Sequence, residues 1–307
     1  MDLYRPLAVS EPVTQHVTHR SDLLAVIGAG LLWGTGGLAG VLLGRWSGAD
    51  PLAVAAYRLL VGGGLVVAGL LLLGRHAELR LGRSAWRRVV VVGLLAATYQ
   101  GCYFAAVELT SVSVATLVTL GSSPLLVVSA EAALTRRRPD PRVLTALAVA
   151  TVGLVLLVGG PSDTAPVAVV LGALLALGSA AGFAAITLLG ARPVAGLGPF
   201  ATTGLSFSVG GLVLVPLALV AGQVSVGLEP ASLGLVVYLG VAPTALAYML
   251  YFSGLRSVRP GPAALIAMLE PLTAAVLGAV LLHERLGPTG IAGGILIGAA
   301  VVICRRG

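Results

Sequence analysis

Lysine is missing from this sequence, and charged residues of all kinds make up only 10% of it. Soluble domains carry about 25% charged residues, so this chain has too little charge to cover an ordinary water-exposed surface. Without lysine there is also no Gly-Lys-Ser/Thr phosphate loop, and ATP is therefore not the energy source within this chain. Hydrophobic residues fill 57% of the 307 positions, as expected for a membrane protein.

Cysteine and histidine are scarce as well. The two cysteines, Cys102 and Cys304, fit neither a disulfide framework nor a metal-binding spacing. All four histidines fall in tails or expected loops, which leaves no zinc cluster and no histidine relay inside the membrane. We therefore expect no metal ion, no cofactor and no catalytic residue.

Apolar runs of about 20 residues recur along the chain, and each is long enough to cross the hydrocarbon core of a bilayer. The runs are continuous and do not alternate apolar with polar residues, which argues against a β-barrel. The sequence therefore predicts an all-α polytopic membrane protein with ten transmembrane helices. The expected spans are residues 22–43, 52–73, 88–107, 113–134, 142–160, 166–189, 199–221, 231–254, 261–283 and 286–303.

Arginine supplies every basic side chain, and its distribution orients the spans. Apart from Arg58, sixteen arginines fall on the side of the two termini, and only Arg45 and Arg285 fall on the other. The positive-inside rule then places both termini in the cytoplasm and the protein in the cell (inner or cytoplasmic) membrane as a multi-pass protein. The net charge of +7 marks orientation and contact with the lipid bilayer, and we expect no nucleic-acid partner.

One pattern occurs twice. The segment SSPLLVVSAEAALTRRRPDP, 122–141, is echoed 147 residues later by LEPLTAAVLGAVLLHERLGP, 269–288. Five spans in each half make the second copy enter the membrane from the opposite side, which predicts two inverted five-helix repeats around a central cavity. The expected parts are a tail (1–21), a first repeat (22–160), a linker (161–165) and a second repeat (166–304). Pro124 and Pro271 are the candidates for helix breaks and gating.

Three charged residues fall inside the predicted spans: Arg58, Glu131 and Glu270. Charge in the bilayer is costly, so each needs a partner, water or a function. Glu131 lies about one turn from a helix end, and we expect a structural role for it near the arginines at 136–138. Glu270 directly precedes Pro271, which cannot donate to the carbonyl of Ala267. This carboxylate is either a substrate-ammonium contact or proton-coupling group, or a packing group satisfied by a neighbour.

Polar residues in other spans are candidates for the substrate pathway. Arg58 is either part of the scaffold or a contact for an anionic substrate group. The segment ATYQGCYF aligns with LAYMLYF at an offset of 148, and its polar side chains need hydrogen-bond partners inside protein or a wet cavity. The candidate pathway residues are Trp33, Arg58, Tyr99, Gln100, Tyr103, Thr244, Tyr248, Tyr251 and Glu270.

The assembled segments resemble EamA-type exporters of the drug/metabolite transporter superfamily. The resemblance rests on LLWGTGG, AAYRLL, PTALAYMLYFSGLRSV and LEPLTAAVLGAVLLHERLGPTGIAGGILIGAAVV, and it extends over residues 23–304. It implies a ten-helix exporter with cytoplasmic termini, a central cavity and alternating access. It also implies that Arg58 and the pair Glu270–Pro271 are positions typical of the family.

These observations predict a secondary or gradient-driven transporter that exports a small metabolite. The substrate is expected to be amino-acid-like, another polar or amphipathic metabolite, or a drug, with protons as a candidate coupling ion. The alternative is an integral-membrane enzyme acting on a lipid or polyprenyl substrate, although the chain lacks the clustered acid, base or metal-binding groups that such chemistry needs. The protein is expected to be a monomer or a homodimer, with Gly290, Gly294 and Gly298 packing within the chain or across a dimer.

Overall fold

The computed structural model describes residues 19–158, 166–283 and 287–305, and these ranges contain helices and no β-strand. Within these ranges, nine helical segments are long and apolar enough to cross a membrane, and the apolar helix Pro288–Cys304 is slightly shorter. The described residues therefore form the polytopic helical membrane protein that the sequence predicts. The expected tail and linker fall almost wholly outside these ranges, as does Arg285.

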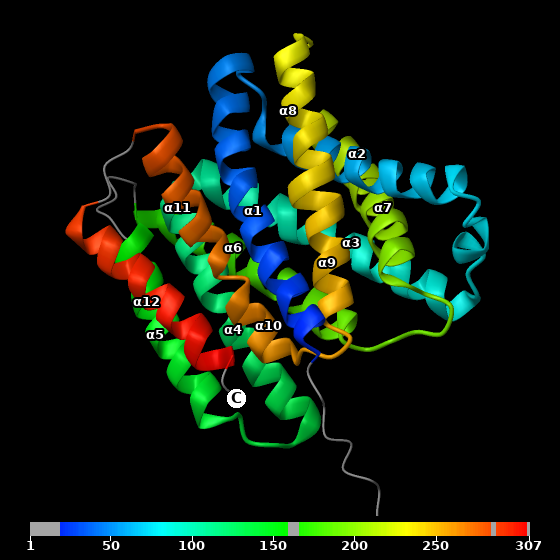
Figure 1. Cartoon of the computed structure of the whole chain (residues 1–307). Coiled ribbons are helices and arrows are strands. Elements are labelled where there is room, and N and C mark those ends of the chain that lie inside the picture. Colours follow the sequence, from blue (N-terminus) through cyan, green and yellow to red (C-terminus); the bar gives the residue numbers. More distant parts are fainter. Residues whose placement is uncertain (1–18, 159–165, 284–286, 306–307) are drawn as a thin grey trace, which may run out of the picture.

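The helices follow the expected spans closely (Figure 1). The first half contains α1 Arg20–Ser47, α2 Pro51–Leu72, the short 3₁₀-helix η1 His76–Leu79, α3 Arg83–Leu109, α4 Val112–Thr135 and α5 Pro141–Val158. The second half contains α6 Pro166–Gly190, α7 Pro199–Val220, α8 Pro230–Gly240, the π-helix η2 Val241–Leu246, α9 Ala247–Gly254, α10 Pro260–Ile266, α11 Leu269–Leu281 and α12 Pro288–Arg305.

Proline begins many of these helices. Proline has no N–H and a fixed φ, and both properties suit the first position of a helix, where the N–H has no intrahelical acceptor. The sequence therefore places many helix starts accurately, because proline cannot continue a helix that precedes it. The helices that begin at proline are α2, α5, α6, α7, α8, α10 and α12.

Pairs of helices approach closely through small residues. A Cβ on Gly63 of α2 would lie 2.5 Å from the backbone nitrogen of Ser208 in α7, and one on Gly153 of α5 would lie 2.8 Å from the carbonyl oxygen of Gly293 in α12. Helices in lipid associate through such close packing. Gly298 does not pack against the described part of the chain, because a Cβ there would meet no atom within 4 Å, and Gly293 makes the close contact on α12. Packing of Gly298 across a dimer stays a prediction.

Helices from the two halves are interleaved. α1 packs against α9 and α11, whereas α6 packs against α3 and α4. α2 and α7 pack against each other, and so do α5 and α12. Figure 1 shows α5 and α12 side by side, and it shows the start of α1 and the end of α12 at the same end of the bundle.

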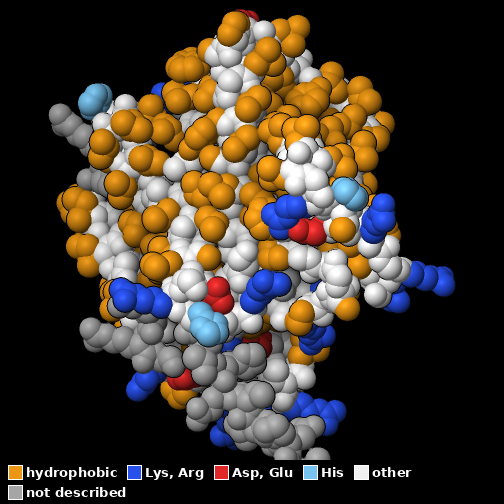
Figure 2. Space-filling model, turned by 45° about the vertical axis from the view of Figure 1, so that its right-hand side comes forward, with side chains coloured by type: hydrophobic (Ala, Val, Ile, Leu, Met, Phe, Trp, Pro, Cys, Tyr) orange, Lys and Arg blue, Asp and Glu red, His pale blue; other side chains and the backbone are white. Residues whose placement is uncertain are grey.

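The outer surface is largely apolar. Figure 2 shows hydrophobic side chains over the upper part of this face and most charged side chains on its right-hand side and lower part. Large exposed apolar side chains such as Leu72, Val220 and Leu212 would be unusual on a soluble monomer. They are expected where lipid replaces water, and the end that holds most arginines lies at the boundary of that apolar zone.

Candidate functional site

The eighth span, Pro230–Gly254, is not a regular α-helix, because η2 interrupts it. Pro243 has no N–H to donate to the carbonyl of Leu239, so that carbonyl needs another partner. The hydroxyl of Thr244 supplies it by donating to Leu239 O at 2.7 Å. A π-turn of this kind frequently marks a functional position.

Arg58 of α2 reaches the π-turn from the other half of the chain. Its Nε donates to Thr244 Oγ1 at 2.9 Å, and its Nη2 lies 3.5 Å from the carbonyl oxygen of Pro243. The hydroxyl of Thr244 therefore accepts from the guanidinium while it donates to the helix. No salt bridge joins Arg58 to Glu270, so the positive charge is held by neutral oxygens.

The ninth span, Pro260–Leu281, is also interrupted. α10 ends at Ile266 and α11 begins at Leu269, with a tight turn between them. The carbonyl of Ala267 accepts from the N–H of Glu270 at 3.0 Å, so the expectation that Pro271 leaves this carbonyl free is wrong. The helix break therefore lies just before Glu270, and this places the carboxylate in the first turn of α11.

The first copy of the proline unit behaves differently. α4 runs unbroken from Val112 to Thr135 through Pro124, so no helix break occurs there. Ser123, the counterpart of Glu270, is buried and donates to the carbonyl of Thr119 at 2.6 Å, which is four residues earlier. The two copies therefore share a sequence pattern but differ in backbone. Both interrupted spans belong to the second half.

Glycines of α1 let that helix approach both interruptions. A Cβ on Gly34 would lie 2.7 Å from the carbonyl oxygen of Glu270, and one on Gly36 would lie 3.1 Å from the Cβ of Pro243. Neither position has room for a side chain. The motif LLWGTGG is thus explained by close packing of α1 against the eighth and ninth spans.

The carboxylate of Glu270 has no hydrogen-bond partner or salt bridge in the described part of the chain, and the residue is only partly buried. The charge of Arg58 interacts electrostatically with this carboxylate without direct contact. The charges of both residues also act on the phenols of Tyr99, Tyr103 and Tyr248. Arg58, Tyr99, Tyr103, Thr244, Tyr248 and Glu270 are here called the central polar cluster.

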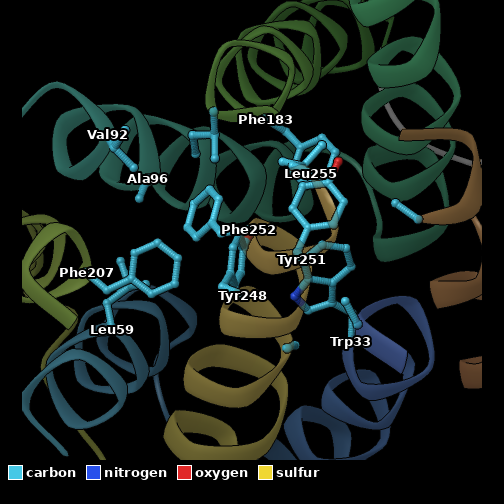
Figure 3. Packing of buried hydrophobic residues seen from close by; sticks show 14 of the residues in the cluster. Trp33, Leu59, Val92, Ala96, Phe183, Phe207, Tyr248, Tyr251, Phe252 and Leu255 are labelled. Carbon is cyan, nitrogen blue, oxygen red and sulfur yellow. The ribbon is translucent and has the colours of Figure 1, made fainter. Parts of the chain in front are cut away.

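The other predicted pathway residues lie in different surroundings. Trp33 and Tyr251 pack edge to face with a ring separation of 5.0 Å, and Tyr251 shares a buried hydrogen bond of 2.9 Å with Thr187. Figure 3 shows these two rings among other buried hydrophobic side chains. Gln100 is buried on α3, and its side chain makes no hydrogen bond to the described residues.

The aromatic packing forms a continuous unit. Trp33, Phe183, Phe207, Tyr248, Tyr251 and Phe252 are here called the aromatic cluster. Tyr248 belongs to both clusters. Its ring packs on Trp33 at 5.0 Å and on Phe207 at 4.5 Å, and its phenol interacts electrostatically with Arg58 and Glu270. The two clusters therefore meet at Tyr248, and Figure 3 shows the packed rings of the aromatic cluster around it.

Glu131 has the structural role that we expect, but with another partner. Its Oε1 accepts from Arg259 Nε at 3.0 Å, and its Oε2 accepts from the N–H of Gly261 at 3.0 Å. The arginines at 136–138, which we expect as its partners, do not bind this carboxylate. The carboxylate instead ties α4 to the first turn of α10 and satisfies an N–H that this helix start leaves open.

Several residues of the site escape sequence reasoning. Pro243 lies in the quoted segment PTALAYMLYFSGLRSV, and a proline in the middle of an apolar run is a visible signal for an irregular helix. Thr187 and Phe183 carry no such signal. They meet Tyr251 only because α6 packs close to α9 and α3 in the folded chain.

Comparison with known proteins places the chain in a family. The model of the EamA-like transporter family matches residues 20–159 and again residues 170–306. An uncharacterized transporter of Bacillus subtilis, YwfM, is 35% identical over 267 residues, which are 87% of each chain. An uncharacterized inner membrane transporter of Salmonella typhimurium, YicL, is 28% identical over 92% of this chain and 95% of its own.

The fold also has a solved counterpart. One crystal structure superposes with a TM-score of 0.79 at 23% sequence identity and covers 93% of this chain and 98% of its own. This likeness supports the helical architecture alone. Together with the double family match and the apolar helices, the chain belongs to the EamA-like transporter family of the drug/metabolite transporter superfamily, and it is a multi-pass membrane transporter.

Proposed function

We propose that this transporter exports a small metabolite across the cell (inner or cytoplasmic) membrane by alternating access, with both termini in the cytoplasm. The observation that carries the proposal is the pair of opposite charges, Arg58 and Glu270, that no salt bridge joins. Charge inside a membrane is costly unless it is paired, hydrated or used. The two groups are therefore available to a ligand that replaces the missing partners.

The chemistry of the central polar cluster suits a small molecule that carries both polar and apolar parts. A guanidinium binds a carboxylate or another anionic group, and a carboxylate binds an ammonium group. The phenols of Tyr99 and Tyr103 add hydrogen-bonding groups with apolar faces. An amino-acid-like substrate would meet both charges, and another amphipathic metabolite or a drug would use one charge and the aromatic faces.

Two inverted five-helix repeats around a central cavity would provide the movement. The first span, α1, packs against α9 of the eighth span and α11 of the ninth span. The sixth span, α6, packs against the third and fourth spans, α3 and α4. This is the pattern expected when spans one to five correspond to spans six to ten. The family model also matches each half separately. These facts support rigid-body rocking of the halves about the central polar cluster.

The closed end of such a cycle is the end that holds most arginines. Phe252 of the aromatic cluster packs on Tyr248 at 6.0 Å and on Tyr251 at 6.4 Å, and Phe207 lies against Tyr248 at 4.5 Å. Rings at these separations pack against one another. We take this arrangement as the state in which the central polar cluster is shut off from the cytoplasm.

Energy would come from the substrate gradient or from exchange with protons. Glu270 is the candidate for proton coupling, because a carboxylate with no fixed partner can exchange a proton and a substrate ammonium group at the same site. Pro271 and the turn before Glu270 would act as the hinge of α11 against α10.

Transport by purified protein in liposomes tests the proposal. Vesicles are loaded with an unlabelled candidate, and uptake of the labelled compound is followed by counterflow with and without a pH gradient. Arg58→Gln is expected to lower counterflow by about tenfold or more, because a charged contact is lost. Arg83→Gln, a change of the same kind at the start of α3, serves as the control. If no amino acid, related metabolite or drug moves under either condition, the proposal is wrong.

A further inference from the structure

A pocket of about 520 Å³ lies at the arginine-rich end of the bundle, between the start of α3, the segment after α6, the start of α7 and the end of α9. Its lining includes three guanidinium groups, from Arg88, Arg192 and Arg256, and no carboxylate. The pocket is separate from the central polar cluster. Phe252 lines it and belongs to the aromatic cluster, so packed rings lie between the two sites.

The positive charges of this pocket are not neutralised by the described residues. Arg88 is held in place by donating from Nη1 to the carbonyl oxygens of Leu189 and Arg192. Arg88 and Arg192 repel each other electrostatically, and neither Arg192 nor Arg256 has a side-chain salt bridge or hydrogen bond to any described residue. The fold gathers these like charges at a cost that an anion would remove.

A carboxylate at the edge of the pocket already has a partner. Glu78 Oε2 lies 3.9 Å from the position that a Cβ would take on Gly198, at the edge of the pocket. Glu78 Oε1, however, accepts from Arg75 Nε at 2.6 Å and lies 2.5 Å from Arg75 Nη2. This pair is neutral as a unit, so it does not compensate the three pocket arginines.

The start of α7 adds further donors to the same wall. Gly198 precedes the helix and offers no side-chain cap, and the first turn contributes Pro199 and Thr202 to the pocket lining. The N–H groups of Phe200 and Ala201 have no intrahelical acceptor, because the first such bond runs from Thr202 N to Gly198 O. The positive end of the 22-residue helix thus faces the arginines' pocket.

The surroundings place this pocket at the depth of lipid headgroups. Trp86 and Phe200 are both exposed, and Arg75 lies over the Phe200 ring at 4.9 Å from its centre. Exposed aromatic side chains next to arginines are typical of the boundary between hydrocarbon and headgroups. A phosphate group at this depth can come from an anionic phospholipid or from a phosphorylated solute in the water beside it.

We propose that this pocket is a binding site for a phosphate group, held by Arg192, Arg256 and the first turn of α7, with Arg88 fixed behind them. Arginine binds phosphate oxygens through paired N–H donors, and a helix start adds backbone donors of the right polarity. Because its walls come from four different spans, a bound phosphate ties these spans together. The expected consequence is a more stable arrangement of the arginine-rich end.

Binding to the purified full-length protein in an uncharged detergent tests this site. The probes are short-chain phosphatidylglycerol and inorganic phosphate, each compared with sodium chloride of equal ionic strength. Arg192→Gln/Arg256→Gln removes two pocket charges and keeps Arg88. Arg83→Gln/Arg87→Gln removes two exposed charges from the same end of the molecule that do not line the pocket. Native mass spectrometry counts bound molecules, and the melting temperature reports stabilisation.

The wild-type chain is expected to bind one phosphate compound and to melt at a higher temperature with it. The pocket variant should bind about tenfold more weakly or worse, while the control pair and Arg192→Lys/Arg256→Lys, which keeps the charges, should retain binding. Stabilisation by the lipid alone identifies a headgroup site, and stabilisation by inorganic phosphate identifies a site for a free phosphate. Equal weakening in the pocket and control variants, or no binding of either probe, would overturn the proposal.

Discussion

Arg58 of α2 donates a hydrogen bond of 2.9 Å to the hydroxyl of Thr244, and the same hydroxyl donates to Leu239 O in the π-turn. One threonine thus connects the first half of the chain to the irregular segment of the second half. The guanidinium is fixed without a carboxylate, so its charge stays available. If α2 moves against the eighth span, the bond between Arg58 and Thr244 either breaks or keeps the two side chains together during the movement.

Replacing Thr244 tests whether its hydroxyl orients the Arg58 guanidinium or whether the residue acts only through packing. Thr244→Val keeps the volume but leaves Arg58 and the Leu239 carbonyl without the hydroxyl, and we expect transport to fall by about tenfold. Thr187→Val is the matched control, because it removes a buried hydroxyl from Tyr251 at a distance from the charges. Counterflow rates of both variants in liposomes check this. Equal loss of transport in the two would show that Thr244 acts only through packing.

Glu270→Gln tests proton coupling. The amide keeps the size of the side chain but cannot exchange a proton, so transport should lose its dependence on the pH gradient. Titratable and charged groups that act on this position are Arg58, Tyr99, Tyr103 and Tyr248, and all four stay unchanged. Glu131→Gln is the control, since this carboxylate is bound by Arg259 and Gly261 outside the central polar cluster. A pH response that survives in Glu270→Gln removes this residue from the proton path.

Gly34→Ala should weaken the packing of α1 on α11. The added Cβ would lie 2.7 Å from the carbonyl oxygen of Glu270, and a backbone atom cannot turn aside as a side chain can. We expect the free energy of unfolding to fall by about 1–3 kcal/mol. Gly44→Ala lies on the same helix, where a Cβ meets nothing within 4 Å, and should leave the melting temperature unchanged. Similar melting of both variants would contradict the close approach.

Gly293→Ala tests the contact between α5 and α12. Its Cβ would lie 2.5 Å from the carbonyl oxygen of Gly153 and 2.6 Å from the backbone nitrogen of Leu157. The loss of stability is expected to be about 1–3 kcal/mol, measured by thermal unfolding in detergent. Gly298→Ala on the open face of α12 is the control. Should Gly298→Ala be the damaging change, that face would have to be covered, as in a homodimer.

We expect Glu131 and Arg259 to contribute unequally to stability, although they bind each other. Arg259→Ala removes a half-exposed guanidinium and should cost about 0–1 kcal/mol. Glu131→Ala also deprives the N–H of Gly261 of its acceptor and should cost about 1–3 kcal/mol. Thermal unfolding of the two single variants compares them. A larger effect of Arg259→Ala would mean that the salt bridge, and not the cap of α10, stabilises this corner.

The sequence predicts the helical fold well, and the reason is local. Long apolar runs need a bilayer, and proline at positions such as 51, 141 and 230 starts helices without regard to distant neighbours. The candidate site is predicted less fully. Arg58 and Glu270 are visible as charges within spans, because such residues are rare in any membrane helix.

The partners of those charges depend on tertiary structure. Arg58 meets Thr244, which is 186 residues away, only because α2 packs against the eighth span. The same dependence explains why Tyr251 pairs with Thr187 and why Glu131 binds Arg259 in place of its sequence neighbours. Hydropathy and proline determine by themselves where this chain crosses the membrane, since both act over a few turns. Contacts between distant helices decide which charges stay unpaired.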